Sequence, residues 1–162
     1  LAKKLILLRN KRQHLKSLKE NKKLVTQRSK QKIFVIGFNK TGTTTLEKTL
    51  LEFDYILGHQ RTAELLFDDI ARESFDSLIH YCKTAEAFQD VPFSFPNIYK
   101  IIDQHYPNSK FILTVRDTPE QWFNSLVNFH SKLWNNGQIP TKEVLANTNY
   151  VYKGYPLKTN QL

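Results

Sequence analysis

The chain has 162 residues, 40% of them hydrophobic, and a formal net charge of +9 at pH 7, so it is long enough for one domain with its own core. Residues 1–32 hold twelve Lys/Arg against the single acid Glu20, a charge of +11, whereas residues 33–162 hold twelve Lys/Arg against fourteen Asp/Glu, a charge of −2. The basic charge is therefore weak evidence for nucleic-acid binding by residues 33–162. No apolar run approaches the roughly twenty residues that span a bilayer.

Residues 1–31 differ from the rest in composition, and we expect a basic helical arm or linker there. Their apolar residues recur at helical spacing with lysines and arginines between them, which is typical of an amphipathic basic helix. Residues 1–30 would then contact a neighbouring domain or lie peripherally on a membrane surface. Nucleic-acid binding is disfavoured because this stretch has no aromatic residue to stack on bases. The apolar positions of the helix are Leu1, Leu5, Leu8, Leu15, Leu18 and Val25.

The first predicted strand, residues 33–37, leads into a loop and then into a helix over about residues 43–53. Gly37 and Gly42 bracket the loop and permit tight turns that bring the backbone close to an anion. The N–H groups and the positive dipole end of the helix would point at that anion, and three consecutive threonines add hydroxyl donors. The glycine spacing matches the first half of a nucleotide P-loop, but the lysine lies inside the loop, at Lys40, instead of after the second glycine.

The middle of the chain supplies one candidate base, Asp90, at the carboxyl end of the second predicted strand. Ligands gather at such strand ends in open α/β sheets, so Asp90 is placed to take a proton from a bound ligand. Its alternative role is to bond the backbone of the turn before Pro92. His59 and His80 are alternative bases, although the apolar neighbours of His80 favour a packed helix residue. The elements expected here are a connector through His59, helices near 61–68 and 71–81, a strand over 86–90 and a helix over 96–105.

A third strand over residues 110–115 is followed by Arg116, whose guanidinium is suited to bidentate hydrogen bonding with a phosphate. A helix over about residues 118–134 follows. Alternating strands and helices predict an α/β fold, a doubly wound parallel sheet flanked by helices. We expect this domain to cover residues 32–162 and to be incomplete at its C-terminus, in a fragment of a longer protein. A final loop is expected to hold Tyr150, Tyr152, Gly154, Tyr155 and Pro156.

Two segments, in this order, resemble the donor-binding motifs of sulfotransferases that use 3′-phosphoadenosine 5′-phosphosulfate (PAPS). Residues 38–44 look like the loop that binds the 5′-phosphosulfate, and the third strand with its following helix looks like the 3′-phosphate site. The resemblance implies a P-loop-like fold in which Lys40 is catalytic. Family members commonly place a serine eight positions after the arginine, where this chain has Asn124, and Ser125 is the ninth. The implied donor-binding residues are Asn39, Lys40, Thr41, Gly42, Thr43, Thr44, Arg116 and Ser125.

The resemblance implies transfer of a sulfuryl group from PAPS to an acceptor hydroxyl of a carbohydrate or small molecule. No metal is expected, because the lysine, hydroxyl and N–H donors neutralise the developing charge. Two other classes stay open: a P-loop nucleoside or small-molecule kinase, and an inactive nucleotide-binding module or truncated copy. The lone Cys82 predicts a buried structural thiol and favours a cytoplasmic location. Aromatic residues that belong either to a cleft or to the core are Phe93, Phe95, Trp122, Phe129 and Trp134.

Overall fold

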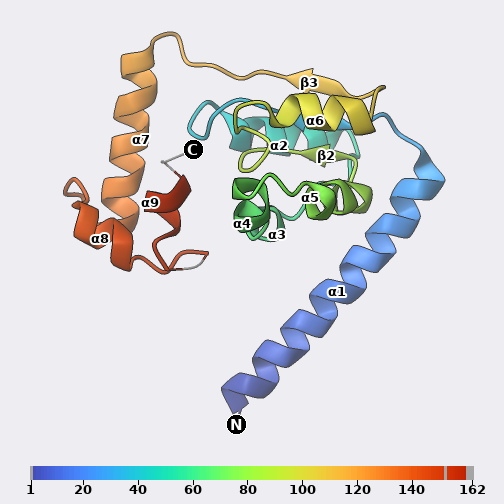
Figure 1. Cartoon of the computed structure of the whole chain (residues 1–162), viewed down its shortest axis with the longest axis horizontal. Helices are drawn as coiled ribbons and strands as arrows, with labels where there is room; N and C mark the ends of the chain where they lie inside the picture. The colour runs from blue at the N-terminus through green and yellow to red at the C-terminus, as the bar shows by residue number, and fades with distance from the viewer. Residues whose placement is uncertain (1, 152, 160–162) are drawn as a thin grey trace.

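The computed structural model describes residues 2–151 and 153–159 as a small sheet surrounded by helices, with one long helix leading away from it (Figure 1). The long helix is α1 (Ala2–Arg28). The strands are β1 (Ile33–Val35), β2 (Ala87–Phe88) and β3 (Lys110–Ile112). The remaining helices are α2 (Thr43–Glu52), α3 (Gln60–Glu64), α4 (Phe67–Ala71), α5 (Asp76–Tyr81), the 3-10 turn η1 (Cys82–Thr84), α6 (Ile98–His105), α7 (Pro119–Trp134), α8 (Lys142–Asn147) and α9 (Tyr155–Thr159).

β1 is the central strand of the sheet, whose order is β2-β1-β3 with both pairs parallel. In the two ladders, Phe34 lies opposite Phe88 on one side and Phe111 on the other. Parallel neighbours need crossover connections, and helices supply them: α2 to α5 between β1 and β2, and α6 between β2 and β3. The predicted α/β class with a parallel sheet flanked by helices is confirmed, whereas the doubly wound, P-loop-like arrangement stays a prediction.

Each face of the sheet carries its own apolar cluster, because successive side chains of a strand point to opposite faces. Phe34 is buried on one face, where its ring centroid lies 5.1 Å from that of Phe88 and 5.8 Å from that of Phe111. Val35 is buried on the other face and clusters with Leu50 of α2. Apolar cover on both faces is what a parallel sheet requires, and it fixes β1 in the middle of the core.

All three strands are shorter than the sequence predicted, and β2 covers only Ala87–Phe88 of the expected residues 86–90. β1 ends at Val35 and β3 at Ile112, whereas strands over residues 33–37 and 110–115 were expected. The Ile36 N–H donates to the Ile112 carbonyl at 2.9 Å, and the chain then turns into the loop at Gly37. Beyond this point β3 has no described strand to pair with, so its β-prone residues continue as extended chain.

The helices also depart from the prediction at two places. Three short helices, α3, α4 and α5, replace the two expected near residues 61–68 and 71–81, and Glu73 interrupts them with a left-handed φ of 56°. α8 precedes the expected final loop, and α9 begins inside it at Tyr155, so the loop prediction was wrong for Tyr155 and Pro156. Thr141 caps α8 by accepting the Val144 N–H at 3.2 Å, and Pro156 stands in the first turn of α9, where its missing N–H costs no helical bond. Tyr152 lies outside the described residues.

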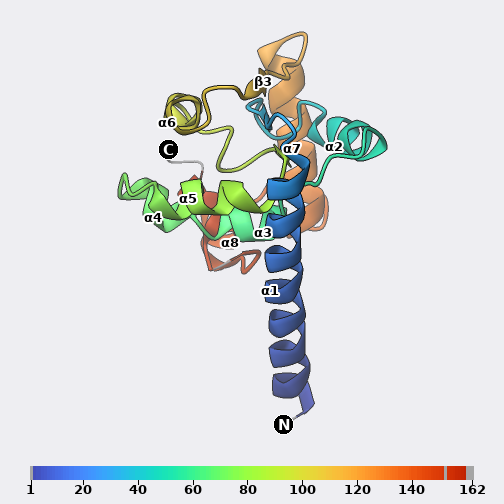
Figure 2. The same ribbon diagram turned by 90° about the vertical axis from the view of Figure 1, so that its right-hand side faces the viewer.

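α1 confirms the expected helical arm. Figures 1 and 2 show its N-terminal end far from the sheet and its C-terminal end entering the domain. Leu15 is half exposed, and the half-buried positions form a different stripe at helical spacing, along which α1 packs against η1. Among the described residues, no helix combines the length and the apolar character needed to cross a membrane. The half-buried stripe consists of His14, Leu18, Asn21, Val25 and Arg28. The side chains of Leu1, Leu5 and Leu8 are not among those that the structure describes.

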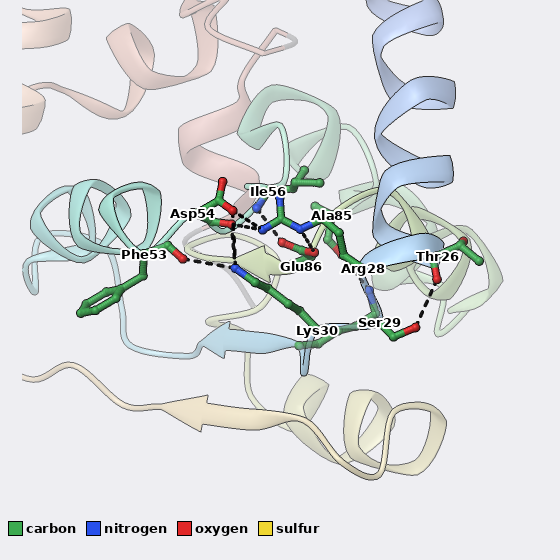
Figure 3. A network of polar contacts seen from close by, with 10 residues as sticks. Thr26, Arg28, Ser29, Lys30, Phe53, Asp54, Ile56, Ala85 and Glu86 are labelled. Carbon is green, nitrogen blue, oxygen red and sulfur yellow. Dashed lines mark hydrogen bonds and ion pairs between the residues drawn. The ribbon is translucent and has the colours of Figure 1, made fainter.

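Two basic side chains fasten the end of α1 to the domain (Figure 3). Arg28 Nε lies 3.1 Å from Glu86 Oε1, and its Nη2 lies 2.8 Å from Asp54 Oδ2. Glu86 is fully buried just before β2, and its Oε2 accepts the Ile56 N–H at 2.9 Å. Lys30 donates to the Asp54 carbonyl at 2.9 Å. A buried carboxylate depends on such partners, so the end of α1 takes part in the packing of the domain.

Candidate active site

The loop between β1 and α2 has the backbone shape expected of an anion cradle. Gly37 lies so close to the chain after β3 that an added Cβ would collide with Thr114, whose backbone nitrogen would be 2.8 Å away. Lys40 and Gly42 adopt left-handed φ values of 65° and 100°. Gly42 is the N-cap of α2 and provides no side-chain cap. The first N–H groups of α2 and the positive end of its dipole therefore face the space in front of the helix.

One side chain from the segment after β3 and one from α7 hold this loop in place by donating hydrogen bonds to the backbone carbonyls of the loop. Arg116 Nε donates to the Lys40 carbonyl at 2.7 Å, and Trp122 Nε1 donates to the Asn39 carbonyl at 3.0 Å. These bonds fix the loop without using the Lys40 ammonium, which lies 3.9 Å from the centroid of the Phe129 ring on α7. The placement of Lys40 thus depends on both Arg116 and α7.

A cavity of about 300 Å³ opens in front of the loop and brings together residues that the sequence had only suggested separately. The loop contributes its cation and the start of α2. The end of β2 contributes a carboxylate, and the chain after β3 contributes a guanidinium. Carboxyl ends of parallel strands meet at one edge of a sheet, which explains the convergence. The predicted site residues that line the cavity are Asn39, Lys40, Gly42, Thr43, Thr44, Asp90 and Arg116.

Asp90 makes the turn contact that the sequence offered as one of its two roles, and its role as a base stays a prediction. Its Oδ1 accepts the Val91 N–H at 2.8 Å in the turn after β2, and the residue also lines the cavity. Burial raises the pKa of this carboxyl above its ordinary value, although the Val91 N–H and the charge of Lys40 oppose the rise. A carboxylate with a raised pKa holds a proton more readily than an ordinary one, which suits a general base.

The two alternative bases do not line the cavity. His59 caps α3 by accepting the Thr62 N–H at 3.3 Å, and its ring centroid lies 4.4 Å from that of His14 on α1. Burial lowers the pKa of His59, and the charges of His14 and Arg61 lower it further. His80 is exposed, so the expectation that it is a packed residue was wrong; the buried side chains of α5 lie on its other face.

The hydroxyl expected at a 3′-phosphate does not line the cavity. Thr118, the residue that shifts the register after Arg116, is the N-cap of α7 and accepts a backbone N–H of the first turn at 3.1 Å. Ser125 is half-buried on α7, and Asn124 is exposed. Thr41 also turns elsewhere, because its Oγ1 lies 2.7 Å from Oγ1 of Thr114. The donor-binding roles of Ser125, Asn124 and Thr41 stay predictions.

Two titratable residues of the cavity were missed by sequence reasoning. Glu64 of α3 is buried, and burial raises its pKa, with the negative charge of Asp90 adding to the rise. His130 of α7 is half-buried, and burial together with Lys40 lowers its pKa, which favours the neutral imidazole. Glu64 belongs to no motif. His130 and Trp134 stand one helical turn apart, a weak pattern that helices share widely.

Aromatic side chains complete the wall of the cavity. Phe129 and Trp134, left open by the sequence between cleft and core, both line it. The Trp134 ring centroid lies 4.4 Å from that of His130 and 6.2 Å from that of Tyr150. Tyr150 and Tyr155 come from the segment that the sequence assigned to a loop, so the C-terminal part of the described chain closes one side of the site.

A second, mainly apolar cavity of about 710 Å³ adjoins the first, and Arg116 lines both. Phe95 and Trp122 line this second cavity, as does Phe93, which also belongs to the core cluster. Cys82 is buried, and burial raises the pKa of its thiol, which confirms a buried structural cysteine. Within the described residues, no group of three or more His, Cys, Asp or Glu side chains is placed to hold a metal ion.

Comparison with known proteins identifies the family. A family model for the sulfotransferase domain matches residues 32–157, from the start of the first core strand through the last residue that lines the cavity. None of the curated proteins compared with the chain matches it. The family match covers most of the chain and includes the loop, Asp90 and Arg116. The chain therefore belongs to the sulfotransferase domain family and is a transferase that moves a sulfuryl group to a hydroxyl-bearing acceptor.

Proposed function

We propose that this protein transfers the sulfuryl group of PAPS to a hydroxyl of a carbohydrate or small molecule. The observation that carries the proposal is the single cavity in which Lys40 and the start of α2 meet Asp90. Sulfuryl transfer needs positive charge and N–H donors at the leaving phosphate oxygen, and it needs a base at the attacking hydroxyl. The lining of the cavity offers both.

In the proposed reaction, Thr43, Thr44 and the first N–H groups of α2 hold the 5′-phosphate. The acceptor oxygen forms a bond to sulfur while the bond between sulfur and the bridging phosphate oxygen breaks. Lys40 stabilises the negative charge that develops on that bridging oxygen, and Asp90 takes the proton of the acceptor hydroxyl. The positive charge in this scheme comes from Lys40 and from the α2 dipole, and no metal is included.

Arg116 is assigned to the 3′-phosphate. Its bond to the Lys40 carbonyl uses Nε, and a guanidinium has four further N–H donors on its two terminal nitrogens. These donors form the fork that binds phosphate with two bonds. Arg116 would thus recognise the 3′-phosphate and hold the backbone of the catalytic lysine at the same time.

The kinase alternative places ATP at the same loop and makes Asp90 a magnesium ligand. It is disfavoured because Thr43 stands after Gly42, where a P-loop kinase has the lysine that reaches the β- and γ-phosphates. The third class, an inactive nucleotide-binding module or truncated copy, would bind a nucleotide without turnover.

A thermal-shift series on the full chain separates these classes. We expect 3′-phosphoadenosine 5′-phosphate to stabilise the protein without magnesium, by about 2.7 kcal/mol at a hundred times its Kd. Adenosine 5′-phosphate, which lacks the 3′-phosphate, should stabilise it much less, and Arg116→Ala should remove this difference. Stabilisation by magnesium–ATP alone would replace the proposal with the kinase. Nucleotide binding without sulfation of any acceptor would support the third class, the inactive nucleotide-binding module or truncated copy.

A further inference from the structure

Two sets of charged side chains line the active-site cavity. The first set is cationic and comes from the phosphate loop and the chain after β3, as Lys40 and Arg116. The second set is anionic and comes from α3 and the end of β2, as Glu64 and Asp90. The donor is itself polyanionic, so its phosphates neutralise the cationic set when it binds. An acceptor that follows then meets the anionic set.

Glu64 is the member of this set that the reaction does not use. Its side chain is buried and lines the cavity, and its Oε2 lies 3.7 Å from Nη1 of Arg61. The Arg61 guanidinium lies 4.4 Å from the centroid of the Tyr150 ring, outside the cavity lining. Glu64 thus lines the cavity, whereas Arg61 does not. A second negative group brought there would be repelled by Glu64, Asp90 and the donor together.

The uncharged part of the same region suits a sugar. Trp134 and Tyr150 line the cavity with aromatic side chains, a residue type whose rings pack against the C–H groups of a sugar. Carboxylates act only as hydrogen-bond acceptors, and neutral imidazole offers one acceptor nitrogen, so Glu64, Asp90 and His130 together call for several hydroxyl donors. A phenol supplies one hydroxyl, whereas a saccharide supplies many. Buried acceptors that stay unpaired weaken binding, which favours the polyol.

We propose that these residues form the acceptor subsite, that its ligand is an uncharged sugar, and that Glu64 determines specificity by rejecting sugars that carry carboxylate or sulfate groups. This inference rests on the proposed function, because the donor must occupy the cationic set first. One sugar hydroxyl is sulfated as described above, and its neighbours bond to Glu64 and His130.

The test uses the full chain saturated with 3′-phosphoadenosine 5′-phosphate and measures sugar binding directly, by saturation-transfer NMR. Methyl glucoside and methyl glucuronide form a matched pair, because they differ only in a CH₂OH group replaced by a carboxylate. We expect methyl glucoside to bind at least tenfold more tightly than methyl glucuronide. Phenol is the third probe and should bind more weakly than the glucoside.

Glu64→Gln keeps the shape of the side chain and removes its charge. The variant should therefore reduce the ratio of the glucuronide Kd to the glucoside Kd severalfold. Glu52→Gln is the control, because Glu52 is exposed at the end of α2 and does not line the cavity. The selectivity of the unmutated chain tests the inference even if Glu64→Gln does not fold.

Equal or tighter binding of the glucuronide, or tighter binding of phenol than of both sugars, would overturn the inference and leave the sulfotransferase proposal standing. An unchanged sugar preference in a folded Glu64→Gln protein would remove the role of Glu64. Failure of the nucleotide itself to bind would overturn the proposed function first and the inference with it. The nucleotide thermal shift shows which of the two has failed.

Discussion

Lys40 is the residue whose side chain bears most directly on the proposed chemistry. We predict that Lys40→Ala lowers the rate of sulfuryl transfer about a hundredfold or more, since it removes a positioned donor to a developing oxyanion. The fold should remain, because the bonds that hold the loop use backbone carbonyls. Lys48→Ala, an exposed lysine on α2, is the control and should keep its rate. Near-normal turnover of Lys40→Ala would remove the lysine from the mechanism.

In the proposed reaction, Asp90 affects both turnover and stability. Because burial raises its pKa, the folded protein binds this proton more tightly than the unfolded chain does, so stability falls as the pH rises from the ordinary carboxyl range through the raised pKa. Asp90→Asn should therefore be at least as stable as the unmutated protein at neutral pH, and asparagine also tolerates the left-handed φ of 57°. Its turnover should fall about a hundred- to ten-thousandfold, with donor binding preserved.

The measurements for Asp90 are melting temperature against pH and kcat against pH. Turnover of the unmutated enzyme should decline as the pH drops through the raised pKa of Asp90, because the base becomes protonated. A His130→Gln variant separates the two candidate proton acceptors. Normal turnover of Asp90→Asn together with lost turnover of His130→Gln would identify His130 as the base.

At the scale of elements, the junction of α1 with the sheet includes the ion pair of Arg28 with Glu86. Arg28→Ala leaves the fully buried Glu86 without its nearest cation, and we predict a loss of about 1–3 kcal/mol in the free energy of unfolding. Lys16→Ala breaks the exposed Lys16–Glu20 pair of the same helix and should cost at most about 0.5 kcal/mol.

Urea denaturation checks both variants, and the double variant Arg28→Ala with Glu86→Gln should recover part of the loss, because the buried charge is then absent. If Arg28→Ala and Lys16→Ala unfold at the same urea concentration, the ion pair does not stabilise the junction.

For the whole molecule, the charge partition and the packing of α1 give a prediction about truncation. The sequence predicted an arm or linker over residues 1–31, and the structure places Arg28 and the stripe from His14 onward against the domain. Deleting residues 1–30 should lower the melting temperature by several degrees, and deleting residues 1–12 should change it little.

Donor affinity should survive both deletions, since the residues that line the cavity begin at Asn39. Binding to anionic vesicles, if present, should weaken with each deletion, because residues 1–32 carry the basic excess. Equal melting temperatures for the two truncated forms would show that the stripe contributes nothing.

The sequence predicted the loop between β1 and α2, because a run of glycines, threonines and one lysine between a strand and a helix is a local pattern, and bonds from Arg116 and Trp122 then hold its backbone. It also indicated the α/β class, since the alternation of strands and helices is a local property. Asp90 and Arg116 were predictable for a related reason: each follows a strand, and the carboxyl ends of parallel strands share one edge.

Only the tertiary structure decided which other side chains reach the cavity. Glu64, His130 and Tyr150 lie on segments whose local pattern contains no motif, and their positions depend on how α3, α7 and the C-terminal segment pack around the loop. The end of β3 also depends on tertiary structure. β3 stops where β1 turns away from it, and the residues of β3 do not encode that point. Local sequence thus indicated the loop before α2, whereas long-range packing decided which side chains of α3, α7 and the C-terminal segment line the cavity.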